Sequence, residues 1–269
     1  MHERVWADEL AGLGDAMATK ADNVEGIYQT ALVNYLVSMA RTVEGSVNRA
    51  LEALNRRDEK LASEVFLTEP RINEMEIVID EHAIRLLRGG NLPEADVRLI
   101  VASLKLNNDL ERIGDLAVNI CQRVISLASM GEIVNPPELQ PMTAAVRGMV
   151  SKSLGALIFQ NVTLANEVLE SDDIVDQYRD RIFESLLTGM SQDPSRIAPN
   201  MHFVLATRHL ERIADHTTNI AEDILFWVRG LDVRHGRALH AGLQPAQHDE
   251  QTHQSRSDDL GGPNPVAAR

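Results

Sequence analysis

Apolar side chains recur along this chain at steps of three and four residues, which is the spacing of one face of an α-helix. The clearest stripe repeats 100 residues later with the same steps, and the two stripes comprise Leu106, Leu110, Ile113, Ala117, Ile120, Val124 and Leu127, then Ala206, Leu210, Ile213, Thr217, Ile220, Ile224 and Trp227. A stripe of this width is the seam by which a helix packs into a bundle. The pattern therefore predicts buried positions on two corresponding helices.

Clusters of glycine and proline divide the periodic segments, with breaks at 89–93, 131–141 and 189–199. The helical stretches predicted between them are 24–57, 59–88 and 94–130 in the first half, and 141–169, 172–188 and 198–229 in the second. Pro70 predicts a kink or a break near the start of the second stretch, because proline lacks the backbone N–H that a helix interior needs.

Short segments show that the two halves are copies of one unit. LERIGD at 110–115 recurs as LERIAD at 210–215, and LASEV at 61–65 resembles LANEV at 164–168. The duplication predicts an all-α fold of two tandem three-helix bundles related by pseudo-two-fold symmetry. We assign the first bundle to 23–135 and the second to 136–235. An N-terminal extension covers 1–22, and a tail over 236–269 is expected to be disordered because it lacks apolar periodicity.

The composition narrows the class of protein. Hydrophobic residues make up 44% of the chain and aromatic residues 4%, a balance that favours helices over sheets. Acidic residues exceed Lys and Arg by 14, so the surface repels nucleic acids and anionic lipid headgroups and suits cations or a basic protein partner. No run approaches the ~20 apolar residues that span a bilayer, and the N-terminus lacks a signal sequence, so we expect a cytoplasmic protein without direct membrane insertion.

Cys121 is the only cysteine, which excludes an intrachain disulfide and a cysteine-based zinc site. It follows Ile120 of the apolar stripe, and we expect a small packed side chain rather than a redox group. The chain also lacks a P-loop, a dinucleotide-binding fingerprint, a nucleophile elbow and an HExxH motif. These absences predict a protein that is not an enzyme.

Paired carboxylates are the clearest candidate chemistry. Glu111 and Asp115 lie four residues apart on one side of a helix, and Glu211 and Asp215 repeat the arrangement. Like charges at this spacing repel each other, so their presence in both copies predicts a cation between them. At ~100° per residue the pairs lie roughly 130° around the helix from the seam, which turns them outward or toward a groove.

A hard cation needs several oxygen ligands, so a neighbouring helix must contribute to each site. The second helical stretch of the first copy carries Glu76 and Asp80, and that of the second copy carries Asp172, Asp176 and Asp180. We therefore expect a metal site in each bundle, formed between two adjacent helices.

Four segments taken together resemble the PhoU family: NEMEIVID at 73–80, LERIGD at 110–115, LERIAD at 210–215 and FWVRGLDVRH at 226–235. The resemblance implies surface metal clusters on each bundle, with iron first among the divalent or trivalent ions and zinc, nickel or magnesium as alternatives. The ligands that it implies are Glu76, Asp80, Glu111, Asp115, Asp172, Asp176, Asp180, Glu211 and Asp215. The three on the second copy's middle helix transfer less directly, because the repeat alignment puts Arg179 and Phe183 opposite Glu76 and Asp80.

The same resemblance implies an adaptor and negative regulator of the phosphate regulon and of phosphate uptake. Family members join the Pst phosphate transporter, through its ATPase PstB, to a sensor histidine kinase of the PhoR type. The expected protein is a homodimer that its partners recruit to the inner face of the membrane. Two departures from the family pattern are Ala214 in place of glycine, and His216 where arginine is common, which bears on the metal preference of the second bundle.

Two other classes of protein stay open at this point. A ferritin-like metal-dependent oxidase uses Glu-x-x-His pairs that point into a bundle, and the only such pair here is Glu250 and His253 in the tail. A metal-independent helical scaffold would leave the carboxylate pairs as a solvated acidic face, or would pair Asp115 and Asp215 with the arginines three residues before them.

Overall fold

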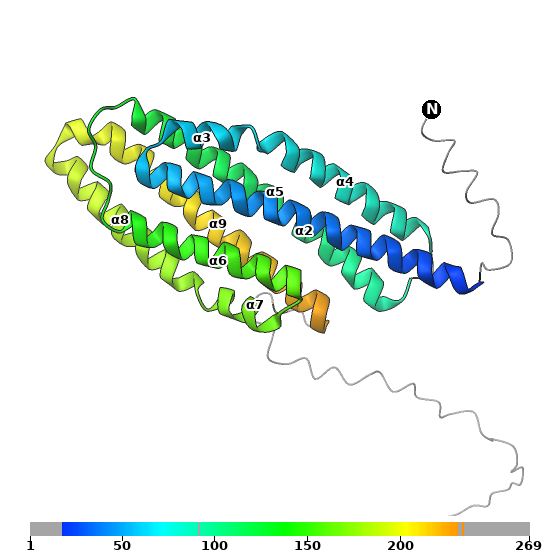
Figure 1. The fold of residues 1–269 in the computed structure, drawn as a ribbon. Coiled ribbons are helices and arrows are strands. Elements are labelled where there is room, and N and C mark those ends of the chain that lie inside the picture. Colours follow the sequence, from blue (N-terminus) through cyan, green and yellow to red (C-terminus); the bar gives the residue numbers. More distant parts are fainter. Residues whose placement is uncertain (1–17, 91, 231–232, 234–269) are drawn as a thin grey trace, which may run out of the picture.

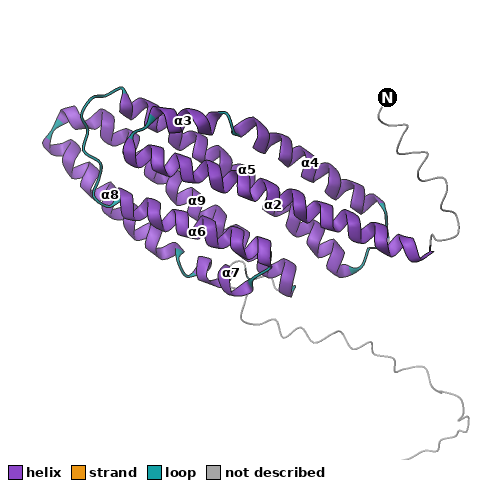
Figure 2. Cartoon of the chain, viewed as in Figure 1, coloured by secondary structure: helices purple, strands orange, loops and turns teal. Residues whose placement is uncertain are grey.

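The computed structural model of this chain describes residues 18–90, 92–230 and 233. Within those ranges every regular element is a helix, as Figure 2 shows, and the all-α prediction is confirmed. The elements are α2 (Ala18–Arg56), α3 (Glu59–Phe66), α4 (Glu69–Arg88), α5 (Glu94–Ala128), α6 (Leu139–Phe159), α7 (Val162–Leu169), α8 (Asp172–Gln192), the 3-10 turn η1 (Pro194–Arg196) and α9 (Ile197–Arg229).

The helices form two bundles that lie side by side. Helices α2, α4 and α5 pack on one another, and α6, α8 and α9 do the same, with the short helices α3 and α7 each preceding the middle helix of their bundle. Figure 1 shows an elongated body, with α3 and α4 along one edge and α7 and α8 along the other. Among the described helices the most extensive contact joins α5 to α9 across the two bundles, and α2 also packs on α6. The two tandem bundles predicted from the repeat are therefore confirmed.

A matched turn separates the first helix of each bundle from the short helix after it. Arg57 and Gln160, which are equivalent in the repeat, both adopt the left-handed conformation, with φ of 54° and 49°. Asp58 and Asn161 follow, and each side chain accepts hydrogen bonds from two backbone N–H groups of the next helix. The single helix predicted over 141–169 is wrong for this reason, because the chain turns at Gln160.

The predicted break near Pro70 is confirmed, since α3 ends at Phe66 and Pro70 lies in the first turn of α4. Backbone N–H groups in the first turn of a helix have no acceptor within the helix, so the N–H that proline lacks is not needed there. Helix α2 begins at Ala18, inside the segment assigned to an N-terminal extension. Residues 1–17 and the tail after 233 lie outside the described residues, so the expectation of a disordered tail stays a prediction. No helix of the described chain is long and apolar enough to cross a membrane.

The two predicted seams form the core of the bundles. All positions of both stripes are buried except Trp227, which is half-buried at the end of α9. Gly114 lets α4 approach α5 closely, because a Cβ atom there would lie 3.0 Å from the Cδ1 atom of Ile72. At the equivalent positions of the second bundle stand Ala214 and Val175, so the added methyl group on one helix is matched by a shorter side chain on the other.

Polar contacts join the two bundles within the α5–α9 interface. His216 Nδ1 lies 2.8 Å from Asp109 Oδ1, and Asn219 donates a longer bond of 3.4 Å to the same oxygen. Lys105 Nζ lies 2.8 Å from Asp223 Oδ1. The sequence analysis connected His216 with the metal preference of the second bundle, and the structure shows that its side chain contacts the other bundle.

Cys121 is fully buried on α5, and burial raises the pKa of its thiol to about 12. Because only the thiolate reacts, we expect a thiol reagent at pH 8 to label the native chain at least about a hundredfold more slowly than the chain in denaturant. Labelling followed by mass spectrometry measures this, with Cys121→Ala as the unlabelled control. Equal labelling rates in native and denaturing buffer would contradict the burial of the Cys121 thiol in the core.

Candidate functional site

Four carboxylates of the first bundle form what we name the first acid group: Glu76 and Asp80 on α4, and Glu111 and Asp115 on α5. All four are half-buried where α4 packs on α5, and the Glu111 side chain is only 15% exposed. Burial, and then repulsion by Asp80, raises the pKa of Glu76. Burial, and then repulsion by Asp115, raises the pKa of Glu111. Asp115 of α5 also raises the pKa of Glu76 on α4, so carboxylates of the two helices lie close enough to repel each other.

Asn107 of α5 connects the first acid group to the core. Its amide Nδ2 donates to the backbone oxygen of Glu76 at 3.0 Å and to Asp80 Oδ1 at 2.9 Å. Its own carbonyl oxygen is buried and has no hydrogen-bond partner in the part of the chain that is described. Arg112 pairs with Glu111 at 3.5 Å, whereas the sequence had offered Asp115 as its partner, and its side chain is 53% exposed.

The second acid group comprises Asp172, Asp176 and Asp180 on α8, with Glu211 and Asp215 on α9. Burial, and then repulsion by Asp215, raises the pKa of Asp172. Burial, and then repulsion by Glu211, raises the pKa of Asp215. Asp172 of α8 and Asp215 of α9 therefore lie close enough to repel each other.

Arg179 of α8 lies among these carboxylates. Its Nη1 atom lies 2.6 Å from Asp176 Oδ1 and 2.5 Å from Glu211 Oε1, and its Nη2 atom lies 2.9 Å from Asp180 Oδ1. Hydrogen bonding to Asp180 is the largest of several effects that raise the pKa of Arg179, so the guanidinium stays charged. The second acid group thus contains a fixed positive charge that bridges α8 to α9.

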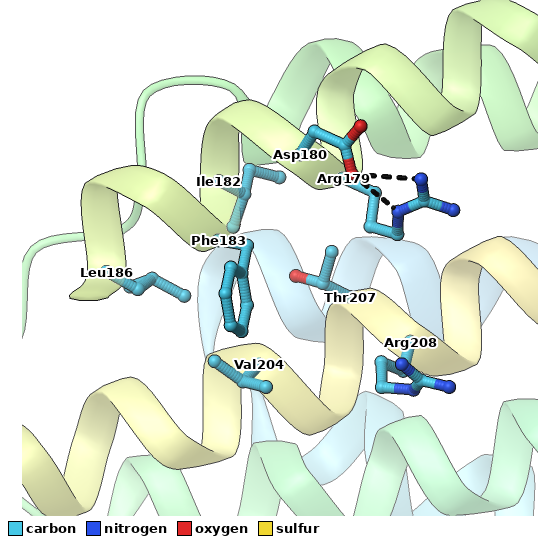
Figure 3. Close-up of a pocket in the computed structure, with 8 residues that line it drawn as sticks. All are labelled: Arg179, Asp180, Ile182, Phe183, Leu186, Val204, Thr207 and Arg208. Atoms are coloured by element: carbon cyan, nitrogen blue, oxygen red, sulfur yellow. Dashed lines mark hydrogen bonds and ion pairs between the residues drawn. The ribbon is translucent and has the colours of Figure 1, made fainter.

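A small cavity adjoins Arg179 between α8 and α9. Its volume is about 210 Å³. Figure 3 shows the residues that line it: Arg179, Asp180, Ile182, Phe183, Leu186, Val204, Thr207 and Arg208. Phe183 and Thr207 occupy the positions of Asp80 and Asn107 in the repeat, so the hydrogen bond of the first bundle is missing here. The Thr207 hydroxyl is buried without a partner among the described residues. Because ligand pockets usually measure about 300–1,000 Å³, we interpret this cavity as a packing gap left by these exchanges.

The two acid groups differ in how well they suit a metal. Among the described residues, no three His, Cys, Asp or Glu side chains already surround one point as metal ligands do. The first acid group nevertheless offers four carboxylates, which are hard oxygen donors, and repulsion among them raises the pKa of Glu76 and of Glu111. Side-chain rotation would bring such donors together around a cation. The second acid group already has a cation in Arg179.

Sequence reasoning found the carboxylates but not the partners that distinguish the two groups. Asn107 lies within the apolar stretch of α5 and carries no motif. Arg179 appeared only as a mismatch in the repeat alignment, opposite Glu76. That mismatch was the available signal, because a guanidinium in place of a carboxylate reverses the charge at one position.

Comparison with known sequences covers both bundles. A sequence model of the PhoU domain matches residues 36–124 and 139–224. A phosphate-specific transport system accessory protein PhoU homolog from Pseudomonas aeruginosa is 38% identical over 203 residues, which are 75% of this chain and 84% of that protein. A homolog of the same name from Aquifex aeolicus is 35% identical over 207 residues, 77% of this chain and 94% of the relative.

Comparison with solved structures gives the same result for the fold. The crystal structure of PhoU from Pseudomonas aeruginosa superposes with a TM-score of 0.74 and 35% identity, and covers 76% of this chain and 99% of its own. The phosphate transport system regulatory protein PhoU from Streptococcus pneumoniae gives a TM-score of 0.70 over 78% of this chain, at 23% identity. The second likeness concerns the fold alone.

Proposed function

Because this chain belongs to the PhoU family, we propose that it is an accessory protein of a phosphate-specific transport system and a negative regulator of phosphate uptake. The observation that carries the proposal is the match of family, relatives and fold across both bundles. In this proposal the chain acts at the cytoplasmic face of the membrane, beside the transporter.

We propose further that the chain works as an adaptor. It would join the transporter ATPase PstB to a PhoR-type sensor histidine kinase when phosphate is plentiful, and so keep the kinase from activating the phosphate regulon. The formal charge of −14 supports docking onto basic protein surfaces, because opposite charges speed encounter and fix orientation. The family likeness also motivates a homodimer, which light scattering of the purified chain would test.

The metal that the family implies fits the first acid group best, and we propose iron there before zinc, nickel or magnesium. Glu76, Asp80, Glu111 and Asp115 would hold it, with Asn107 orienting Asp80 through its amide. When bound, the ion supplies positive charge that relieves the repulsion among the four carboxylates. The residues themselves would then hold α4 and α5 together at the protein surface that partners approach.

The oxidase alternative has less support than the adaptor. Its Glu-x-x-His pair, Glu250 and His253, lies outside the described residues. The carboxylates of the first acid group are half-buried beside the contact of α4 with α5, whereas the seam positions of α5 are fully buried and apolar. An oxidase centre of that class instead points its ligands into the bundle interior.

Deletion of the gene tests the regulatory proposal. We expect phosphate-starvation genes to be expressed in phosphate-rich medium when the chain is absent, and repression to return with the intact gene. Co-purification from cells grown at high and at low phosphate should recover PstB and the sensor kinase, with more of both at high phosphate. Normal repression in the deletion strain, with no second copy of the gene, would contradict the proposal.

A further inference from the structure

The second acid group departs from the first at one decisive position. The repeat offset of 103 residues places Arg179 opposite Glu76, while the offset of 100 places Glu211 and Asp215 opposite Glu111 and Asp115. One helix of the second group therefore presents a guanidinium where the first group presents a carboxylate. Arginine in place of glutamate changes the local charge by two elementary charges, while the Glu and Asp pair on the facing helix is the same in both bundles.

The guanidinium contacts the ligands that a metal would need. Its Nη1 atom reaches Asp176 on its own helix and Glu211 on α9 at 2.6 and 2.5 Å. The Arg179 side chain is 26% exposed and that of Glu211 is 19% exposed, so bulk water screens this pair only partly. These contacts place one positive charge among the five carboxylates and occupy one oxygen of Glu211.

We propose that Arg179 is a built-in cation that takes the place of a metal in the second bundle, so that the chain binds metal at the first acid group alone. The first half of this statement stands on the contacts of Arg179, and the second half rests on the metal site proposed above. The two bundles then have different roles: one responds to metal availability, and the other keeps a permanent bridge between α8 and α9.

Iron content of the untagged full-length chain tests the proposal. The chain and its variants are loaded with Fe²⁺ without oxygen, desalted and analysed by mass spectrometry for metal. We expect Glu211→Ala with Asp215→Ala to keep the iron content of the parent. Loss of about half the iron in that variant would show that Arg179 moves aside for a metal, and would overturn the proposal.

A second arm restores the missing ligand. In a chain whose first acid group is removed by Glu111→Ala and Asp115→Ala, Arg179→Glu should raise bound iron at least about fivefold, because it exchanges a cation for an oxygen ligand. Arg179→Gln, which removes the charge and adds no carboxylate, is the matched control and should gain less. Circular dichroism checks that each variant is folded. No gain from Arg179→Glu in a folded chain would overturn the proposal.

The two arms separate this inference from the function on which it rests. If the parent chain binds no iron at all, the metal site proposed for the first bundle fails. Arg179→Glu still decides the inference in that case, since a gain of iron that Glu211→Ala reverses supports the built-in cation. Histidines outside the described residues are present in every variant, so any iron that they bind is common to all.

Discussion

Replacing Phe203 with alanine is expected to lower the free energy of unfolding by about 3–5 kcal/mol. Phe203 is fully buried, and it is the largest fully buried side chain in the part of the chain that the structure describes. It lies on α9, which packs on α5, α6, α7 and α8. Because the ring is fully buried, the substitution leaves a cavity that the surrounding core fills only in part. Urea unfolding followed by circular dichroism measures the change.

Phe183 provides the matched control for this substitution. It is the same residue type on the neighbouring helix α8, but it is 52% exposed. Phe183→Ala removes only about half as much buried area and opens no enclosed cavity, so we expect a loss of about 1–2 kcal/mol. A similar loss in both variants would mean that the packing of α9 is not what stabilises the molecule.

The second large effect concerns metal. Glu111→Ala combined with Asp115→Ala should reduce the iron bound by the untagged chain at least about tenfold, because two ligands of the proposed site are lost together. Metal analysis after loading with Fe²⁺ measures the content. The thermal midpoint should also rise on adding Fe²⁺ to the parent chain and not to the variant, since a ligand stabilises only the state that binds it.

Glu94→Ala combined with Asp96→Ala is the control for net charge. Both residues lie in the first turn of α5, so the variant removes two negative charges from the same helix, away from the acid pair. We expect it to keep the iron of the parent chain. Unchanged iron in the Glu111 and Asp115 variant would contradict the metal site and favour the metal-independent scaffold. The regulatory proposal would then depend on the deletion experiment alone.

The long helices α5 and α9 were predictable because a seam of seven positions repeats in both copies and proline or glycine marks the segments around them. The turn at Gln160 was not predictable in this way, since neither glycine nor proline occurs there. A left-handed glutamine followed by an asparagine cap becomes visible only when Gln160 and Asn161 are aligned with Arg57 and Asp58.

In the candidate site, too, features within one helix were predictable from the sequence, whereas contacts between helices were not. Glu111 and Asp115 were found because helical geometry places residues four apart on one side. The contacts of Asn107 with Asp80, and of Arg179 with Glu211, join residues 27 and 32 positions apart. They depend on how one helix rests on the next, which periodicity within a single helix does not determine.

The fit between Gly114 and Ile72, and its counterpart between Ala214 and Val175, has a consequence for engineering. Grafting α9 into the place of α5 would push an extra methyl group against the isoleucine. The reverse graft would leave a void beside the valine. The two halves repeat one structural unit, but the residues at this contact are matched separately in each half. A hybrid molecule therefore needs Gly114 together with Ile72, or Ala214 together with Val175.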